Sequence, residues 1–240
     1  MRYIASVIAA AATLAASNAY AADMPVKAAQ RTIAPAFSWT GFYAGVNLGY
    51  GWARASATST VTGGTLAGST VTGSSNMNGI NGGGQVGFNY QTGAIVWGIE
   101  ADIQASGQRQ TTTVGALTEE DRLRAFATVR GRVGVTAWDR GLLYVTGGYA
   151  WMDARSTVTS GGVTLIDLSS NKGGWTVGGG GEWMFAPNWS AKLEYLYMRA
   201  DNVTGTAALP APFGGTITSN ARIENNVIRA GLNYHFGGPR

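Results

Sequence analysis

The 240-residue sequence contains no cysteine, a single histidine and few charged residues, which make up 12% of the chain. Without cysteine it cannot form a disulfide framework, a thiolate metal site or a lipoprotein anchor. One histidine leaves too few nitrogen ligands for the usual zinc sites, so we predict no metal and no other cofactor. The formal net charge of +4 comes from scattered cations, which argues against a nucleic-acid partner.

The chain also lacks an apolar run of the roughly 20 residues that a transmembrane helix needs. The longest such run, Ile4 to Ala16, follows Arg2 and precedes Ala19-Tyr20-Ala21, as in a cleaved secretory signal peptide. We therefore predict a signal peptide over residues 1–21 and a periplasmic linker over residues 22–38. A mature protein with no apolar helix can cross a membrane only as a β-barrel, which we place at residues 39–240.

What the sequence has in abundance is alternation with a period of two residues, which begins after Trp39 and recurs eight times. In the first run, Phe42, Val46 and Trp52 share one face. Tyr43 and Asn47 share the other. The seven later runs start near Ile80, Ile95, Leu123, Leu142, Trp175, Ala191 and Ile228. Each run predicts a strand with one apolar and one polar face.

The connections between these runs alternate in length. Short ones lie at Gln91 to Gly93, Ala137 to Gly141 and Ala186 to Asn188. Long ones, rich in Ser, Thr, Gly and Ala, lie at Ala53 to Asn78, Gly107 to Asp121, Met152 to Lys172 and Ala200 to Asn220. This pattern predicts an all-β fold, an eight-stranded antiparallel transmembrane β-barrel. Both termini then lie with the tight turns on the periplasmic side, and four long, mobile loops face the cell exterior.

A soluble eight-stranded barrel such as a lipocalin also alternates, but it keeps its apolar face inside. Two features favour the inverted, membrane arrangement. The polar faces carry charges of both signs that could pair in a closed interior. Aromatic residues such as Trp52, Trp151 and Trp183 gather near the ends of the apolar faces, as in the interfacial belts of membrane barrels.

The last strand carries a further signal. Arg229, Gly231, Tyr234 and Phe236 give a polar-x-Gly-x-x-aromatic-x-aromatic spacing close to the end of the chain. Behind a secretion signal, this spacing predicts recognition by the barrel-assembly machinery. The chain continues for four residues beyond Phe236.

Several segments resemble the small alphaproteobacterial outer-membrane immunogenic protein family, a porin-like group of eight-stranded outer-membrane barrels. They are Trp39-Thr40-Gly41-Phe42-Tyr43, Gly98-Ile99-Glu100-Ala101-Asp102, Thr128 to Gly134, Tyr144 to Gly148 and Lys192 to Tyr197. The resemblance covers most of the chain from Trp39 to Phe236. It implies a surface-exposed, antigenic protein of the outer membrane, with pore activity or haemin binding in some members.

Nine charged residues fall on predicted inward faces: Glu100, Asp102, Arg124, Arg130, Arg132, Glu182, Lys192, Glu194 and Arg229. An eight-stranded barrel is just wide enough for side chains to fill it. These residues therefore predict a network of ion pairs that plugs the lumen, with a narrow, charge-lined solute path as the alternative. A small excess of bases over acids still leaves most charges able to pair.

Catalysis and nucleotide binding are both disfavoured. The only histidine, His235, lies at the periplasmic end of the last strand rather than at an extracellular rim. Gly82, Gly84 and Gly87 spell GxGxxG, but the residues that follow predict a strand instead of the helix that a dinucleotide site requires.

The sequence thus predicts a structural, surface-exposed outer-membrane protein that is not an enzyme. The alternatives are a small-solute channel and, on the family resemblance alone, a haemin receptor. The expected partners are outer-membrane lipid and lipopolysaccharide, the barrel-assembly machinery, and ligands on host or environmental surfaces.

Overall fold

A computed structural model describes residues 38–138, 140–201, 203–208 and 214–236 of the chain. The predicted signal peptide and all but the last residue of the predicted linker lie outside these residues, as do the last four residues of the chain. Among the described residues, no helix is long and apolar enough to cross a membrane.

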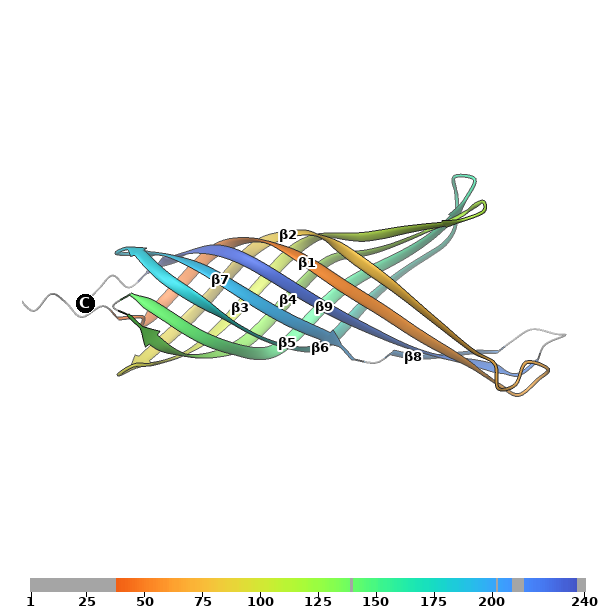
Figure 1. Cartoon of the computed structure of the whole chain (residues 1–240), viewed down its shortest axis with the longest axis horizontal. Helices are drawn as coiled ribbons and strands as arrows, with labels where there is room; N and C mark the ends of the chain where they lie inside the picture. Colours follow the sequence, from red (N-terminus) through yellow and green to blue (C-terminus); the bar gives the residue numbers. More distant parts are fainter. Residues whose placement is uncertain (1–37, 139, 202, 209–213, 237–240) are drawn as a thin grey trace, which may run out of the picture. The chain divides into compact units, whose positions relative to one another are not determined.

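The described residues form one antiparallel sheet of nine strands. The strands are β1 (Gly41–Thr62), β2 (Thr70–Thr92), β3 (Ile95–Val114), β4 (Leu117–Ala137), β5 (Gly141–Ser160), β6 (Val163–Ala186), β7 (Trp189–Ala200), β8 (Val203–Ala208) and β9 (Thr216–His235). Neighbours in the chain pair in order up to β7, which pairs with β9, and β9 returns to pair with β1 (Figure 1). The short β8 adds only to the outer part of β9. The ring therefore has eight strands, and the predicted antiparallel β-barrel is confirmed.

The alternation along each strand places apolar side chains on the outer face of the ring. In β1, Phe42 is 65% exposed and Val46 is 64% exposed, whereas Tyr43 and Asn47, which directly follow them, are buried. The other ring strands follow the same rule along their central parts. Because a soluble barrel would hide these apolar side chains from its surroundings, the outer face fits a lipid environment.

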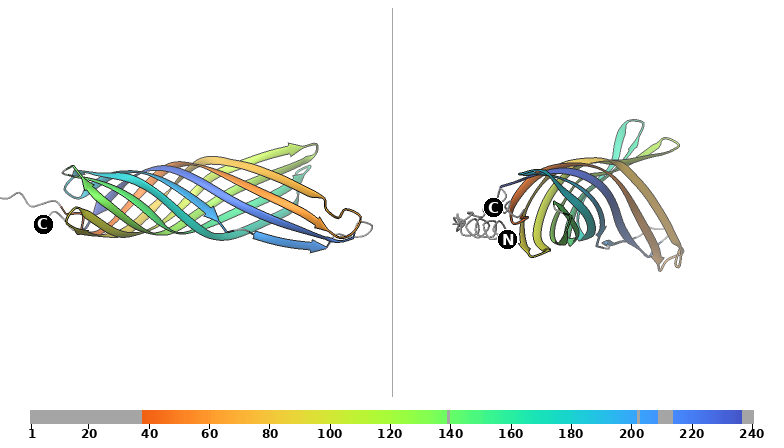
Figure 2. Two further views of the ribbon diagram at one scale, coloured as in Figure 1. Left: turned by 60° about the horizontal axis from the view of Figure 1, so that its bottom comes forward. Right: turned by 60° about the vertical axis from the view of Figure 1, so that its left-hand side comes forward.

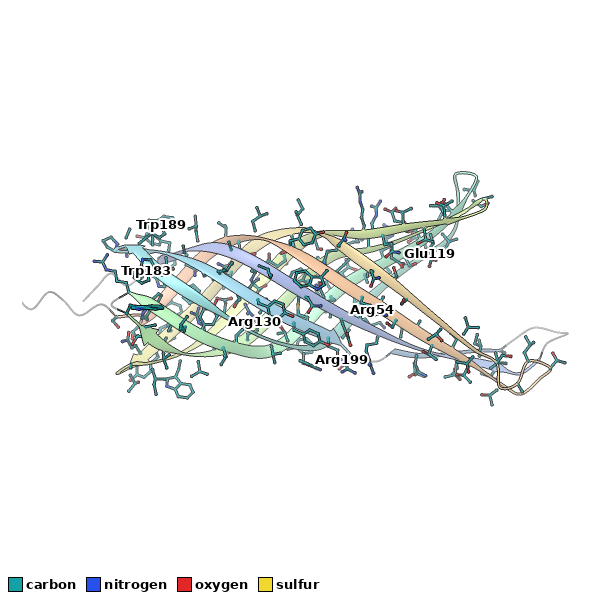
Figure 3. The ribbon with its side chains drawn as sticks, in the orientation of Figure 1. Arg54, Glu119, Arg130, Trp183, Trp189 and Arg199 are labelled. Carbon is teal, nitrogen blue, oxygen red and sulfur yellow. The ribbon has the colours of Figure 1, made fainter. Side chains whose placement is uncertain are left out.

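Aromatic side chains on the outer face gather towards the two ends of this apolar band. We call one end the short-turn end because it carries the tight turns, and Trp183 and Trp189 both lie there (Figure 3). Trp189 contacts Tyr234 at a ring-centroid distance of 5.2 Å. Towards the opposite, long-hairpin end, Trp175 contacts Tyr197 at 5.4 Å. Two aromatic belts of this kind are typical of transmembrane barrels, whose interfaces lie at headgroup level.

The long connections are not the extended mobile loops that the sequence predicts. Most of their residues continue the strands as β-hairpins, as in the hairpin of β5 and β6, which turns at Gly161-Gly162 with both residues at positive φ. Serine and threonine suit these extensions because their hydroxyls can bond across strands, as the Ser59 and Ser219 hydroxyls do at 2.9 Å. The loop prediction is therefore wrong for most of these residues.

The hairpins divide into two groups beyond the ring. Pairing between β2 and β3 ends at Asn78 and Arg109, and pairing between β6 and β7 ends at Gly174 and Ala200. Beyond these points β1, β2, β8 and β9 form one group, while β3 to β6 form the other. The tips of the two groups diverge in Figure 1 and again in Figure 2.

We expect heat-modifiable migration of the folded protein on SDS gels. A closed ring presents no free strand edge in the membrane band from which unfolding can begin. Unboiled protein should therefore run as a compact species that disappears on boiling, measured on protein extracted from membranes. Identical migration of boiled and unboiled samples would contradict the closed barrel.

Candidate functional site

The interior of the barrel is arranged in layers along its axis. At the short-turn end a buried apolar layer consists of Trp39, Val96, Leu142, Tyr144 and Met184. Towards the long-hairpin end a second apolar layer consists of Leu123, Phe126, Ala150, Met152, Leu196, Met198, Ala200 and Val227. Charged side chains lie between the two. The charged residues therefore lie between two clusters of buried apolar side chains, and buried amides such as Gln104, Gln108 and Asn225 share the long-hairpin side with the second cluster.

Arg130 on β4 is the centre of the charged layer. Its guanidinium donates to Glu194 at 2.9 Å and to Asp102 at 2.9 Å, and it also contacts Glu100. Its Nε donates to the Thr128 hydroxyl at 2.9 Å, so all three guanidinium nitrogens are engaged. Arg130 is 1% exposed. A buried guanidinium is tolerated only where carboxylates and hydrogen bonds replace its water, as they do here.

Two further cations complete this cluster from the neighbouring strands β7 and β9. The Arg229 guanidinium donates to Glu194 at 2.7 Å and to Asp102 at 3.0 Å. The Lys192 ammonium donates to both carboxylate oxygens of Glu100 at 3.0 Å. Each of these three acids therefore contacts at least two of the cations, so the charges form a shared network rather than separate pairs.

A second group lies beside the first, around Arg132 on β4. Its guanidinium donates to Glu182 at 2.8 Å and to the Tyr43 hydroxyl at 2.9 Å, and Tyr43 in turn donates to Glu100 at 2.7 Å. Arg132 also lies over the ring of Tyr144, 4.1 Å from the ring centroid. This stacking supplements the ion pair because the face of an aromatic ring attracts a cation. Tyr43 links the two charged groups.

Inward-facing glycines make room for these long side chains. A Cβ at Gly148 would lie 2.1 Å from the Val129 carbonyl oxygen and 2.7 Å from the Cα of Arg130, its register partner. A Cβ at Gly180 would lie 2.4 Å from the Leu193 carbonyl oxygen. Since a real Cβ is not found at such distances, a larger residue here would displace the strand beside the charged layer. Glycine on the inward face therefore lets charged side chains cross a narrow interior.

Arg124 does not belong to this interior, and its prediction as a lumenal residue is wrong. The register of β4 against β5 shifts between Leu123 and Ala125, so Arg124 is the extra residue of a β-bulge. One extra residue reverses the alternation, which places both Leu123 and Phe126 inside and leaves Arg124 exposed. The described interior therefore holds four carboxylates, Glu100, Asp102, Glu182 and Glu194, with Arg130, Arg132, Lys192 and Arg229 beside them.

A chain of amides extends the network along β1, β2 and β9. The Asn47 amide donates to Gln85, and the Gln85 amide donates to Asn233 at 2.7 Å. The Asn233 amide donates to Glu182 at 2.7 Å, which joins this chain to the charged layer. Sequence reasoning placed these residues on inward faces without giving them a role, because amides carry no charge to count.

Ser190, His235 and Glu182 also meet in the interior, but not in the geometry of a hydrolytic triad. The Ser190 hydroxyl donates to Glu182 at 2.6 Å and lies 3.0 Å from His235 Nε2. The same Nε2 lies 3.5 Å from Glu182. A triad needs the acid on the opposite ring nitrogen, where it orients the base. All three residues are buried.

The four residues of the predicted assembly signal lie on opposite faces of β9. Arg229 and Gly231 face the interior, whereas Tyr234 and Phe236 face outward. The Phe236 N–H donates to the Phe42 carbonyl at 2.9 Å, the last backbone bond between the two ends of the sheet. The glycines of the GxGxxG sequence lie within β2, whose pairing continues through them, so they form a strand and not a phosphate-binding loop.

A closed antiparallel ring with an apolar outer face, two aromatic belts and a charged interior defines the class of transmembrane β-barrels. Residues 7–236 match the family described as "Outer membrane protein beta-barrel domain". The chain belongs to this family, and it is a protein of the outer membrane.

Two curated relatives support the same conclusion over nearly their full lengths. The 31 kDa outer-membrane immunogenic protein of Brucella melitensis is 33% identical over 246 residues, covering 96% of this chain and 98% of the relative. The 25 kDa outer-membrane immunogenic protein of Brucella abortus is 30% identical over 242 residues, covering 98% and 100%. Among solved structures, the outer membrane protein OprG of Pseudomonas aeruginosa shares 12% identity, with a TM-score of 0.47 and coverage of 82% and 97%.

We expect strong energetic coupling between Arg130 and the acids that it contacts. Arg130→Met leaves four buried carboxylates opposed by only three cations. An uncompensated buried charge typically costs about 3–5 kcal/mol of the free energy of unfolding. A double-mutant cycle with Glu194→Gln should recover part of this loss, because the neutral amide no longer needs the cation. Urea unfolding of the protein in lipid vesicles measures each variant.

Glu182→Gln is the matched control, because in the described interior Glu182 pairs with Arg132 and makes no hydrogen bond or ion pair with Arg130. Its cycle with Arg130→Met should give a smaller coupling energy than that of Glu194. Equal coupling energies for the two acids would show that the described pairing is not what holds the network together.

Proposed function

We propose that this protein is a structural, surface-exposed barrel of the outer membrane whose interior is plugged rather than open. The observation that carries the proposal is the balance of the interior charges. Four carboxylates and four cations contact one another between two apolar layers. Such an arrangement stabilises a closed wall in the membrane and leaves little for a solute to bind.

The alternative function, a narrow solute channel, needs a hydrated path lined by charges that ions can reach. The cations of the interior are engaged by carboxylates and hydroxyls, with no stripe of one sign along the described interior. Phe126, Met152 and Met198 are buried on the long-hairpin side of the charges, and an apolar constriction there would oppose the passage of water and ions. These features favour the plugged interpretation over the channel.

The proposal includes an orientation and a role outside the membrane. The short turns and both ends of the sheet lie together, as on the periplasmic side of outer-membrane barrels, so the long hairpins face the cell exterior. The relatives are named as immunogenic outer-membrane proteins, which fits hairpins that reach beyond the membrane surface. We propose that these hairpins contact host or environmental surfaces and that the protein is not an enzyme.

We further propose that the end of β9 is the segment that the barrel-assembly machinery recognises, and that residues 237–240 are dispensable. A chain ending at His235 loses the Phe236 backbone bond to Phe42 and the ring contact with Tyr234 at 5.3 Å. A chain ending at Phe236 keeps both. The longer chain should accumulate in the outer membrane like the full chain, and the shorter one should accumulate less, measured as heat-modifiable protein. Equal amounts of the two would contradict this role of Phe236.

The proposed plug predicts very small conductance in a planar bilayer, well below that of large porins. An interior of this strand number is filled by side chains, whereas 16-stranded barrels leave an aqueous channel. The variant Arg130→Gln/Glu194→Gln should show equally small conductance, because both apolar layers remain. Large, stable current steps from verified monomer would overturn the plug. A change in ion selectivity on neutralising Arg130 and Arg132 would support the channel instead.

A further inference from the structure

The pairing of β2 with β3 stops short of the hairpin tips and leaves two free strand edges. The ladder ends at Asn78 and Arg109, although β2 continues outward to Thr70 and β3 to Val114. Beyond that point β2 pairs with β1 alone and β3 pairs with β4 alone. The two hairpin groups diverge there (Figure 1, Figure 2). The sheet is therefore interrupted between two edges whose backbone groups can pair with another strand.

The side chain of Gln110 indicates what the edge of β2 can bind. The Asn76 N–H donates to Gln110 Oε1 at 2.5 Å, so a side-chain carbonyl takes the place that the main-chain carbonyl of a neighbouring strand would occupy. Along an antiparallel strand, the N–H and C=O of every second residue point to the same side. Those of Ser74 and Thr72 therefore point the same way as those of Asn76, and no described strand lies beside them on that side.

A cavity of about 400 Å³ lies beside this edge, between the two hairpin groups. Small residues make up its wall on β1 and β2, whereas its wall on β3 and β4 is polar. The lining includes Ala55, Gly73, Gln110, Glu119, Asp121 and Arg222. Because Ala55 and Gly73 have little or no side chain, long side chains of an added strand have room to enter.

The cavity has two carboxylates on the wall opposite β2. Asp121 and Glu119 lie two and four residues beyond the buried Leu123, so they share its inward face. In the described chain neither of them makes an ion pair, whereas the outward-facing Glu120 pairs with Arg122. Glu119 is labelled on the hairpins of β3 to β6 in Figure 3. Negative charge without a cation of its own therefore lies close to a free strand edge.

The one cation of the lining does not change this conclusion. Arg222 comes from β9 and already has an interaction of its own within the chain. Even counted with the carboxylates of Glu119 and Asp121, it leaves the lining with a net charge of one negative unit. A cationic ligand is therefore favoured.

We propose that this edge binds an extended peptide segment of another protein, with basic side chains on one face, which adds to β2 as a further strand. Its backbone pairs with Ser74 and Thr72. Its inward-facing Lys or Arg side chains extend into the cavity to Asp121 and Glu119. In strand addition of this kind, main-chain hydrogen bonds give affinity and pockets for alternate side chains give specificity.

A second copy of this chain would fit the edge less well. Residues 70–77 of β2 and residues 110–114 of β3 contain no Lys or Arg. Two copies paired through these edges would satisfy each other's backbone groups but would bring no cation to Asp121 and Glu119. Charge complementarity therefore favours a basic segment over self-association.

The site deepens the proposed contact with external surfaces, and it rests on that proposal only for the side of the membrane from which the peptide comes. The test therefore uses the full chain folded in detergent micelles, where both ends of the barrel are open to solution. A wrong orientation in the membrane cannot make this test fail, so failure would concern the site itself.

The probe is a fluorescein-labelled peptide of about eight residues, a usual strand length, in which Thr alternates with Lys. Fluorescence anisotropy measures its Kd at about 0.15 M salt, where long-range attraction between exposed charges is largely screened. One comparison peptide alternates Thr with Glu. The other keeps the Lys residues but is N-methylated at every backbone nitrogen, so it retains the charge and loses the N–H groups that strand pairing needs.

Two substitutions test the two halves of the site. The cavity variant is Glu119→Gln/Asp121→Asn. Its matched control, Glu120→Gln/Asp167→Asn, removes the same charge from acids of the same hairpin group that already pair with arginines. The edge variant is Ser74→Pro, which removes one N–H from the free edge, where proline is tolerated. Heat-modifiable migration of each variant shows that the barrel is folded.

The wild-type protein and the control should bind the Lys peptide, and the cavity and edge variants should bind it at least about tenfold more weakly. Binding of the Glu peptide and of the N-methylated peptide should be weaker by a similar factor. No binding of the Lys peptide to the wild-type protein, or equal binding by the cavity variant and the control, would overturn the site.

Two further outcomes would overturn the mode of binding. If the N-methylated peptide binds as tightly as the Lys peptide, the peptide is held by charge alone and strand addition is wrong. If the wild-type protein is dimeric in detergent and Ser74→Pro makes it monomeric, the edge pairs with a second copy of the chain and the assignment to a basic peptide is wrong.

Discussion

The pairing of β1 with β9 is the constraint on which the rest of this structure depends. In lipid, a backbone group without a partner costs several kcal/mol, so a sheet of polar-faced strands is stable there only as a closed ring. Closure also creates the interior, where water is scarce and charged side chains must satisfy one another. Arg130 and Arg229 would be costly in isolation, but the ring brings them to the carboxylates of Asp102 and Glu194. The apolar outer face and the charged core are thus two results of the same closure.

Much of the fold follows from alternation, because a closed sheet in lipid forces every second residue outward. The strand order, the short turns and the outward face of residues such as Val46 are therefore predictable. The bulge at Arg124 is not, since the sequence does not show where β4 gains a residue relative to β5. The length of the hairpins also cannot be predicted from the sequence, because runs of Ser, Thr and Gly suit both loops and polar strands. A strand exposed to water on both faces leaves no hydrophobic pattern to detect.

For the interior, sequence could predict which kinds of residue face inward, but not their partners. Which carboxylate Arg130 reaches depends on strand tilt and on the glycines opposite it. The apolar layers did leave a signal, since Leu196 and Met198 follow the inward positions of Lys192 and Glu194 on β7. Apolar residues on both faces of one segment are a pattern that the proposed plug would require.

The position of Arg229 on the last strand makes the charge balance depend on the same strand that closes the ring. Without β9, the interior has four carboxylates but only Arg130, Arg132 and Lys192 to oppose them, an excess of one negative charge. β9 therefore supplies both the backbone pairing with β1 and β7 that closes the ring and the fourth cation. A barrel without β9 has an unpaired strand edge, and its interior carboxylates outnumber its interior cations. Ring closure and charge balance are thus coupled, because the same strand provides both.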